Sequence, residues 1–165
     1  MKIASYDIVF QEIPDEVTLA LNISQCPCHC PGCHSPHLAD DIGEELNESL
    51  LAGLLQTYGK GITCVCMMGG DAAPCEVNRW LAYIHTKGLK TAWYSGREHK
   101  SADVSDDNLD YLKLGPYIAE RGALKNPGTN QRLYKRCLPA PSAVGTNNPS
   151  SAQWADLTPL FWRHG

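Results

Sequence analysis

Four cysteines lie close together near the N-terminus, in the segment from Ser24 to His34, which reads SQCPCHCPGCH. So dense a group is difficult to pair as disulfides, because neighbouring loop positions seldom meet the geometry of that bond. Thiolates are soft ligands that suit iron–sulfur clusters, and four cysteines normally saturate one cluster. The C-x3-C-x2-C spacing of Cys26, Cys30 and Cys33 supplies only three ligands. It therefore predicts a cluster with one iron left open, as a catalytic metal site requires.

A structural zinc site is the alternative for the same segment. It would use Cys26, Cys28, Cys30 and Cys33, or include His29 or His34. Zinc sites usually combine two ligand pairs that are separated by a longer loop, whereas all the ligands here fall in one short run. The spacing favours the cluster, and a zinc-binding interaction module without catalysis remains the competing hypothesis.

Two further loops contain residues that suit ligand binding. Gly69-Gly70-Asp71 ends a predicted strand, and Ser95 follows the next one. Two glycines and an acid commonly form a simple turn, but glycine also lets a backbone approach a ligand closely. Cys64 and Cys66 alternate along a predicted strand and should point to one face. With Cys75 and Cys137 they have no recognisable cluster spacing.

The elements that position these loops follow from hydrophobic periodicity. Helices are expected from the Asn47 cap to Tyr58 and from Pro74 to about Gly88. Strands are expected over residues 7–9, 17–23, 62–68, 89–94, 109–114 and 131–135. This alternation predicts an α/β fold with a mainly parallel sheet. The cysteine loop and the Gly-Gly-Asp loop both follow strands directly, so they should share the carboxyl edge of the sheet.

Composition limits the remaining possibilities. The 165 residues suit one domain, with a tail rich in Pro, Ser and Asn from about residue 138 that we expect to be mostly loop. The net charge of −4 gives no reason to expect a nucleic-acid partner. No run approaches the roughly 20 apolar residues that cross a bilayer, and the start lacks an apolar signal core. We therefore expect a cytoplasmic protein without a membrane partner, in which eight cysteines favour metal binding or redox chemistry.

The cysteine loop resembles the signature of radical S-adenosylmethionine enzymes. Its sequence, Cys30-Pro31-Gly32-Cys33 followed by His34-Ser35-Pro36, is similar to that of the activating proteins of anaerobic ribonucleoside-triphosphate reductase. Two later stretches, Gly115-Pro116-Tyr117-Ile118 and Asn130-Gln131-Arg132-Leu133-Tyr134, and the segment from Tyr6 to Pro14 support the same resemblance. The resemblance covers most of residues 5 to 136.

The resemblance implies a fold and a set of ligands. The fold would be a single radical-SAM domain over residues 1–165, a shortened and partial (open) βα barrel. Cys26, Cys30 and Cys33 would hold a [4Fe–4S] cluster, with Cys28 as a bystander. S-adenosylmethionine would meet the backbone of Gly69, Gly70 and Asp71, where Asp71 replaces the glutamate usual in the superfamily. Other contacts to this cofactor would come from Ser95 and Lys113.

The resemblance also implies an activity. The enzyme would cleave S-adenosylmethionine to methionine and a 5′-deoxyadenosyl radical, which would remove hydrogen from a glycine of the reductase. The partners would be the anaerobic ribonucleoside-triphosphate reductase and a low-potential electron donor such as flavodoxin. A radical enzyme that acts on a small molecule, or on another glycyl-radical enzyme, is the alternative within the superfamily. The aromatic tail at Phe161 and Trp162 is expected to pack on the chain's own core.

Overall fold

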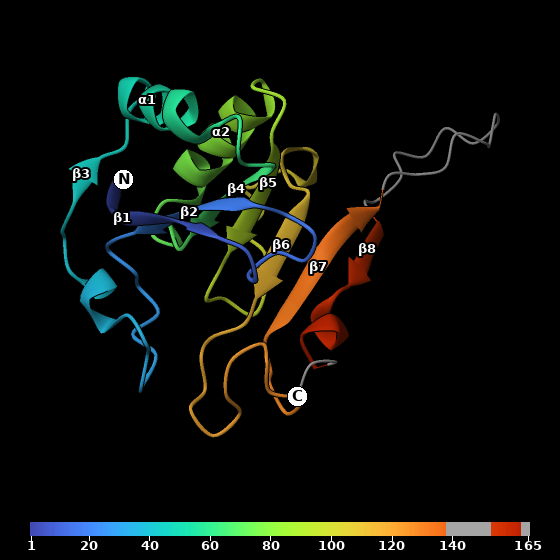
Figure 1. Cartoon of the computed structure of the whole chain (residues 1–165). Helices are drawn as coiled ribbons and strands as arrows, with labels where there is room; N and C mark the ends of the chain where they lie inside the picture. The colour runs from blue at the N-terminus through green and yellow to red at the C-terminus, as the bar shows by residue number, and fades with distance from the viewer. Residues whose placement is uncertain (138–152, 163–165) are drawn as a thin grey trace.

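The computed structural model describes residues 1–137 and 153–162, which form one mixed sheet with two α-helices (Figure 1). The helices are α1 (Glu48–Tyr58) and α2 (Pro74–His85), and three short 3-10 helices are η1 (Pro36–Ala39), η2 (Asp106–Asn108) and η3 (Thr158–Trp162). The strands are β1 (Lys2–Val9), β2 (Thr18–Ile23), β3 (Glu44–Glu45), β4 (Cys64–Met68), β5 (Lys90–Tyr94), β6 (Tyr111–Leu114), β7 (Arg132–Cys137) and β8 (Gln153–Asp156). Their order across the sheet is β3-β1-β2-β4-β5-β6-β7-β8.

The α/β class is confirmed, but the expectation of a mainly parallel sheet is wrong. Parallel pairing joins β2, β4, β5 and β6 in the centre, and antiparallel pairing adds the four outer strands. The difference lies in the connections. A helix between β4 and β5 carries the chain back to the starting edge, as a parallel neighbour requires. The links from β1 to β2 and from β6 to β7 contain no helix, so those strands return antiparallel.

Both helices cover one face of the sheet, as Figure 1 shows. The Asn47 side chain caps α1 by accepting a hydrogen bond from the Leu50 amide at 2.9 Å, as its sequence position predicts. The core on this face is made by Leu51 and Leu54 of α1, by the buried stripe Val77, Trp80, Leu81 and Ile84 of α2, and by strand residues such as Leu19, Val65, Met67 and Trp93.

The opposite face of the sheet, here called the helix-free face, is covered by connecting segments. It presents Cys64 and Cys66 side by side with Ala92, Tyr111 and Leu133, as alternation along the strands requires. Ile13 from the β1–β2 connection and Leu124 from the β6–β7 connection pack on it. Phe161 of η3 packs there too, which confirms the expected packing of the aromatic tail on the core.

Residues 153–162 contain more regular structure than their composition suggests. The expectation of a loop-rich tail from about residue 138 is wrong for residues 153–162, which form β8 and η3. β8 pairs with β7, and the Thr158 hydroxyl accepts a hydrogen bond from the Leu133 amide at 2.9 Å. The rest of the expected tail lies outside the described residues. Among the helices that are described, none is long and apolar enough to cross a membrane.

Candidate functional site

The cysteine loop and the Gly-Gly-Asp loop lie together at the carboxyl edge of the sheet, as expected. Their strands β2 and β4 are parallel neighbours, with Asn22 in register with Met68, and β5 follows with Tyr94 in the same row. Three segments therefore follow neighbouring strands at the same edge of the sheet: residues 24–38, 69–71 and 95–97. The side chains of Cys28 and Asp71 meet there, with Sγ 3.8 Å from Oδ2.

The cysteine loop is held in a tight, irregular conformation. Gln25 and His29 adopt positive φ values of 59° and 44°, which are uncommon for residues other than glycine. The Cys26 amide donates to the Leu38 carbonyl at 2.8 Å, and the Ser35 amide donates to Cys33 Sγ at 3.4 Å. An amide that donates to sulfur stabilises negative charge on the thiolate, which suits a metal ligand.

The four thiols of this loop are free and partly buried. Within residues 1–137 and 153–162, no three His, Cys, Asp or Glu side chains lie close enough to hold a single metal ion. Tetrahedral coordination of one ion at the usual Zn–S bond length would place the sulfurs about 3.8 Å apart. A cubane cluster does not require its cysteine sulfurs to lie this close together, because each cysteine binds a different iron. Three thiols on one short loop, one of them receiving an amide hydrogen bond, are a donor set that fits a cluster.

Both glycines of the Gly-Gly-Asp loop are required by the backbone. Gly69 and Gly70 have φ values of 96° and 88°, which side chains rarely allow. The Gly69 carbonyl accepts a hydrogen bond from the Trp93 indole at 2.8 Å, which fixes the loop on β5. A Cβ atom at Gly70 would lie 2.6 Å from Val77 Cγ2. That direction leads into α2.

The Asp71 carboxylate connects the three loops. Oδ1 accepts from the Ser95 hydroxyl at 2.6 Å, and Oδ2 accepts from the Gly96 amide at 3.0 Å as well as from Cys28. Ser95 is almost fully buried, and its hydroxyl oxygen also accepts from the Arg97 amide at 3.0 Å. The expected site residue Ser95 is therefore brought to Asp71, and its hydroxyl is engaged inside the protein. Burial, together with the charges of Asp71 and Cys26, raises the pKa of the Cys28 thiol to about 12.

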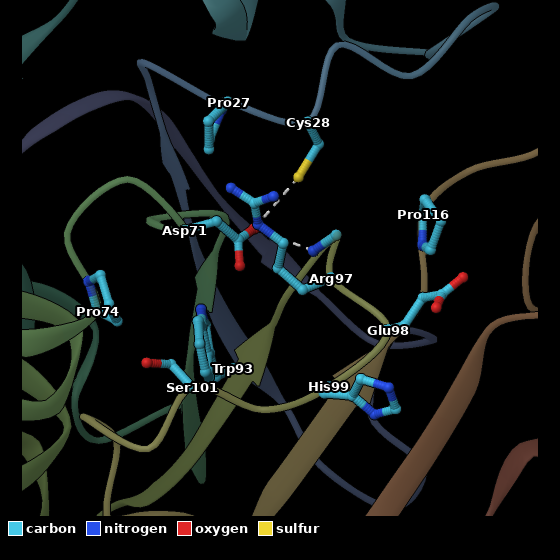
Figure 2. Close-up of a pocket in the computed structure, with 11 residues that line it drawn as sticks. Pro27, Cys28, Asp71, Pro74, Trp93, Arg97, Glu98, His99, Ser101 and Pro116 are labelled. Atoms are coloured by element: carbon cyan, nitrogen blue, oxygen red, sulfur yellow. Dashed lines mark hydrogen bonds between the residues drawn. The ribbon is translucent and has the colours of Figure 1, made fainter.

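A cavity of about 590 Å³ opens beside this cluster and is called the rim cavity (Figure 2). This volume is in the usual range of small-molecule sites. Trp93, Pro74 and Pro116 provide apolar wall, and the loop after β5 supplies polar side chains. The complete lining is Pro27, Cys28, Asp71, Pro74, Trp93, Gly96, Arg97, Glu98, His99, Ser101 and Pro116.

Sequence reasoning missed most of this lining. Glu98, His99 and Ser101 carry no motif, and Trp93 and Pro74 are ordinary strand and helix residues. The signal that could have found the first three is position, since they follow β5 at the carboxyl edge where α/β sheets bind ligands.

Lys113 lies one strand further along, on the helix-free face. Its backbone carbonyl accepts from the Ser95 amide at 2.9 Å, and its ammonium donates to the Gly115 carbonyl at 2.9 Å. Burial lowers the pKa of Lys113 to about 8, against the opposing effect of the negative charges of Cys30 and Asp71. The side chain lines a second cavity of about 280 Å³ with Tyr94, Gln131 and Phe161, and is not among the residues that line the rim cavity.

The remaining cysteines are distributed over the fold. Cys64 and Cys66 are fully buried on β4, and burial raises the pKa of both thiols well above its usual value. Cys75 is exposed on α2, and Cys137 ends β7. These positions give the four thiols no common site.

Comparison of the chain with protein-family models, curated proteins and solved structures finds no match.

Proposed function

We propose that this chain is a radical S-adenosylmethionine activase that generates a glycyl radical on anaerobic ribonucleoside-triphosphate reductase. The observation that carries the proposal is the meeting of the C-x3-C-x2-C loop with the Gly-Gly-Asp loop at the carboxyl edge of a parallel strand pair. The cofactor role of the Gly-Gly-Asp loop is implied by the resemblance to which the cysteine loop belongs. The contact of the two loops at Cys28 and Asp71 supports a single site that uses both.

In this proposal Cys26, Cys30 and Cys33 hold a [4Fe–4S] cluster. Such a cluster, bound and reduced, would supply one electron for cleavage of a carbon–sulfur bond of S-adenosylmethionine, which would give methionine and a 5′-deoxyadenosyl radical. The chain itself would hold the thiolates in place, orient the cofactor and limit the access of water to the site. The hydrogen bond from the Ser35 amide to Cys33 favours the thiolate form of that ligand.

The rim cavity is the proposed place for the cofactor's nucleoside portion. Pro74 and Pro116 offer apolar surface to a base, while His99 and Ser101 offer polar groups to a ribose. The Gly69–Asp71 backbone lies at the same edge, held by Trp93 and by the bonds of Asp71. We assign the amino group of the cofactor to this backbone and its carboxylate to Lys113, whose ammonium is kept in a poorly solvated place one strand away.

The finer fold proposal is a shortened, partial βα barrel. It is supported by the parallel strands β2, β4, β5 and β6, which have helices on one face only. The helix-free face would then correspond to the inside of the barrel. A partial barrel leaves one side open, and that side would admit the polypeptide loop that presents the glycine of a protein substrate.

The proposal is tested by anaerobic reconstitution of the chain with iron and sulfide. Reduced protein should convert S-adenosylmethionine to 5′-deoxyadenosine, and Cys30→Ala should not. Electron paramagnetic resonance of a mixture with the reductase should show a glycyl doublet only when chain, reductase, cofactor and reductant are all present. Production of 5′-deoxyadenosine without the doublet would refute the assigned substrate, and bound zinc without iron–sulfur absorption would refute the radical chemistry.

A further inference from the structure

The surplus cysteine of the loop occupies a space that only a glycine can leave open. A Cβ atom built on Gly96 would lie 2.6 Å from Cys28 Sγ and 3.2 Å from Cys28 Cβ. A contact below 3.0 Å forces one of the two groups to shift: Cys28 Sγ can move by rotation of its side chain, whereas Cys28 Cβ, at 3.2 Å, moves only with the backbone. Gly96 does not have a positive φ, so the backbone conformation alone does not require glycine at this position. Glycine is favoured here by the packing of Cys28 against the loop that follows β5.

The same contact is reinforced by a carboxylate. Asp71 Oδ2 accepts hydrogen bonds from Gly96 N at 3.0 Å and from Cys28 Sγ at 3.8 Å, and Figure 2 shows both as dashed lines. Asp71 Oδ1 accepts from Ser95. Residues from the ends of β2, β4 and β5 therefore converge on one point, and Cys28 is the residue that the cysteine loop contributes.

Backbone hydrogen bonds join the two ends of the loop to each other, and an aromatic contact attaches it to the β6–β7 connection. Gln25 and Cys26 donate to the carbonyls of Asp40 and Leu38 at 3.1 and 2.8 Å, and the His34 ring packs edge-on against Tyr117 with centroids 4.9 Å apart. The stretch between these attachments includes His29, whose positive φ is costly for a residue with a side chain. A strained backbone persists only where surrounding contacts hold it. Cys28 supplies such a contact next to the strained residue.

The geometry points to Cys28 as a positioning residue, not a cluster ligand: its packing on Gly96 and Asp71 fixes the cysteine loop on the ends of β4 and β5. What the loop then binds rests on the proposed function, whereas the contact itself does not. The pattern C-x-C-x-C-x2-C is thereby divided into three ligands and one attachment point.

The first test uses the chain without metal, and compares thermal unfolding of four variants with the wild type. Gly96→Ala should lower the midpoint by about 3–10 °C, as overpacking does in a chain of this size. Adding Cys28→Ala should recover most of that loss, because the nearest clash then relaxes from 2.6 to 3.2 Å. Cys28→Ala alone should lower the midpoint only slightly. Gly53→Ala is the control for a glycine with free space around it: nothing lies within 4 Å of a Cβ there, and the midpoint should rise because alanine stabilises the interior of α1 relative to glycine.

The second test separates positioning from general stability. The Gly96→Ala variant is reconstituted at a temperature well below its unfolding midpoint, so that it is folded. It should then bind less than half of the iron and sulfide that the wild type binds. The double variant, Gly96→Ala with Cys28→Ala, should bind nearly the wild-type amount. Full loading of folded Gly96→Ala would overturn the inference, as would a double variant whose midpoint falls by the sum of the single changes. If the wild type takes up no cluster at all, the proposed function fails, and the coupling in unfolding still decides whether the contact exists.

Discussion

The carboxylate of Asp71 satisfies a hydroxyl, an amide and a thiol from two other loops. A glutamate at this position would carry its oxygens one methylene further out and would not fit the same short bonds. The aspartate is therefore explained by local geometry, whatever the loop binds.

The cysteine ligands can be separated by single substitutions. Cys26→Ala, Cys30→Ala and Cys33→Ala should each abolish cleavage of S-adenosylmethionine, because a cluster held by two thiolates is lost. Cys28→Ala should keep the cluster and lose less than about fivefold in activity, since it removes a packing contact and a weak hydrogen bond. Iron content and 5′-deoxyadenosine formation are the measurements. Loss of the cluster in Cys28→Ala as complete as in Cys30→Ala would contradict the ligand assignment.

A buried carboxylate at the opposite end of the strands predicts a pH effect. Burial acts to raise the pKa of Glu16, but hydrogen bonds from Lys90, Thr63 and Tyr111 outweigh it and lower the pKa below its ordinary value. Since the folded pKa is depressed, Glu16 stabilises the fold above pH 4.5 and this contribution disappears as the pH falls through the folded pKa.

Urea unfolding at a series of pH values tests this. Glu16→Gln should cost about 2 kcal/mol near pH 7, because charged hydrogen bonds of a buried group are lost, and should flatten the dependence below pH 4.5. Glu98→Gln, at an exposed rim position, is the control. An unchanged acid limb in Glu16→Gln would show that this carboxylate does not titrate with folding.

Among the elements, the turn from β4 into α2 is closely packed against that helix. Gly70→Val should reduce both stability and binding of S-adenosylmethionine, because φ of 88° disfavours a side chain and the new Cβ would meet Val77 on α2. We expect a loss of about 2–4 kcal/mol in the free energy of unfolding. Cofactor affinity of the folded fraction should fall further than its iron content, since the cysteine loop does not contact this position. Equal affinity in wild type and variant would count against a cofactor role for the loop.

For the molecule as a whole, the C-terminal segment closes one side of the sheet. Thr158 is fully buried and accepts from the Leu133 amide, and the Trp162 indole donates to the Leu124 carbonyl at 3.1 Å. These bonds attach η3 to β7 and to the β6–β7 connection. Phe161 then lines the cavity that contains Lys113, so the segment forms part of a wall near the proposed site.

Thr158→Val tests the importance of this closure. The substitution keeps the shape and leaves the Leu133 amide without its acceptor, which should cost about 1–3 kcal/mol. Chemical denaturation measures the loss, with Thr57→Val on the exposed side of α1 as control. If both variants unfold at the same denaturant concentration, the C-terminal segment contributes little to the fold.

Local patterns in the sequence determined much of what is found. The cap at Asn47, the stripe Val77, Trp80, Leu81 and Ile84 and the alternation of Cys64 and Cys66 each depend on neighbours in the chain, and all three appear as predicted. The meeting of residues 24–38 with 69–71 was also predictable, because parallel strands end at one edge. The three-ligand spacing remains a prediction about chemistry.

Other features depend on contacts between residues far apart in the sequence, and only the tertiary structure decided them. The antiparallel outer strands and β8 result from connections whose direction no local pattern encodes. The bonds of Asp71 to Ser95 and Gly96, and the space that Gly96 leaves for Cys28, exist only once three loops are folded against one another. The sequence shows four cysteines in one short run, whereas the tertiary structure shows that Cys28 packs on Gly96 and Asp71.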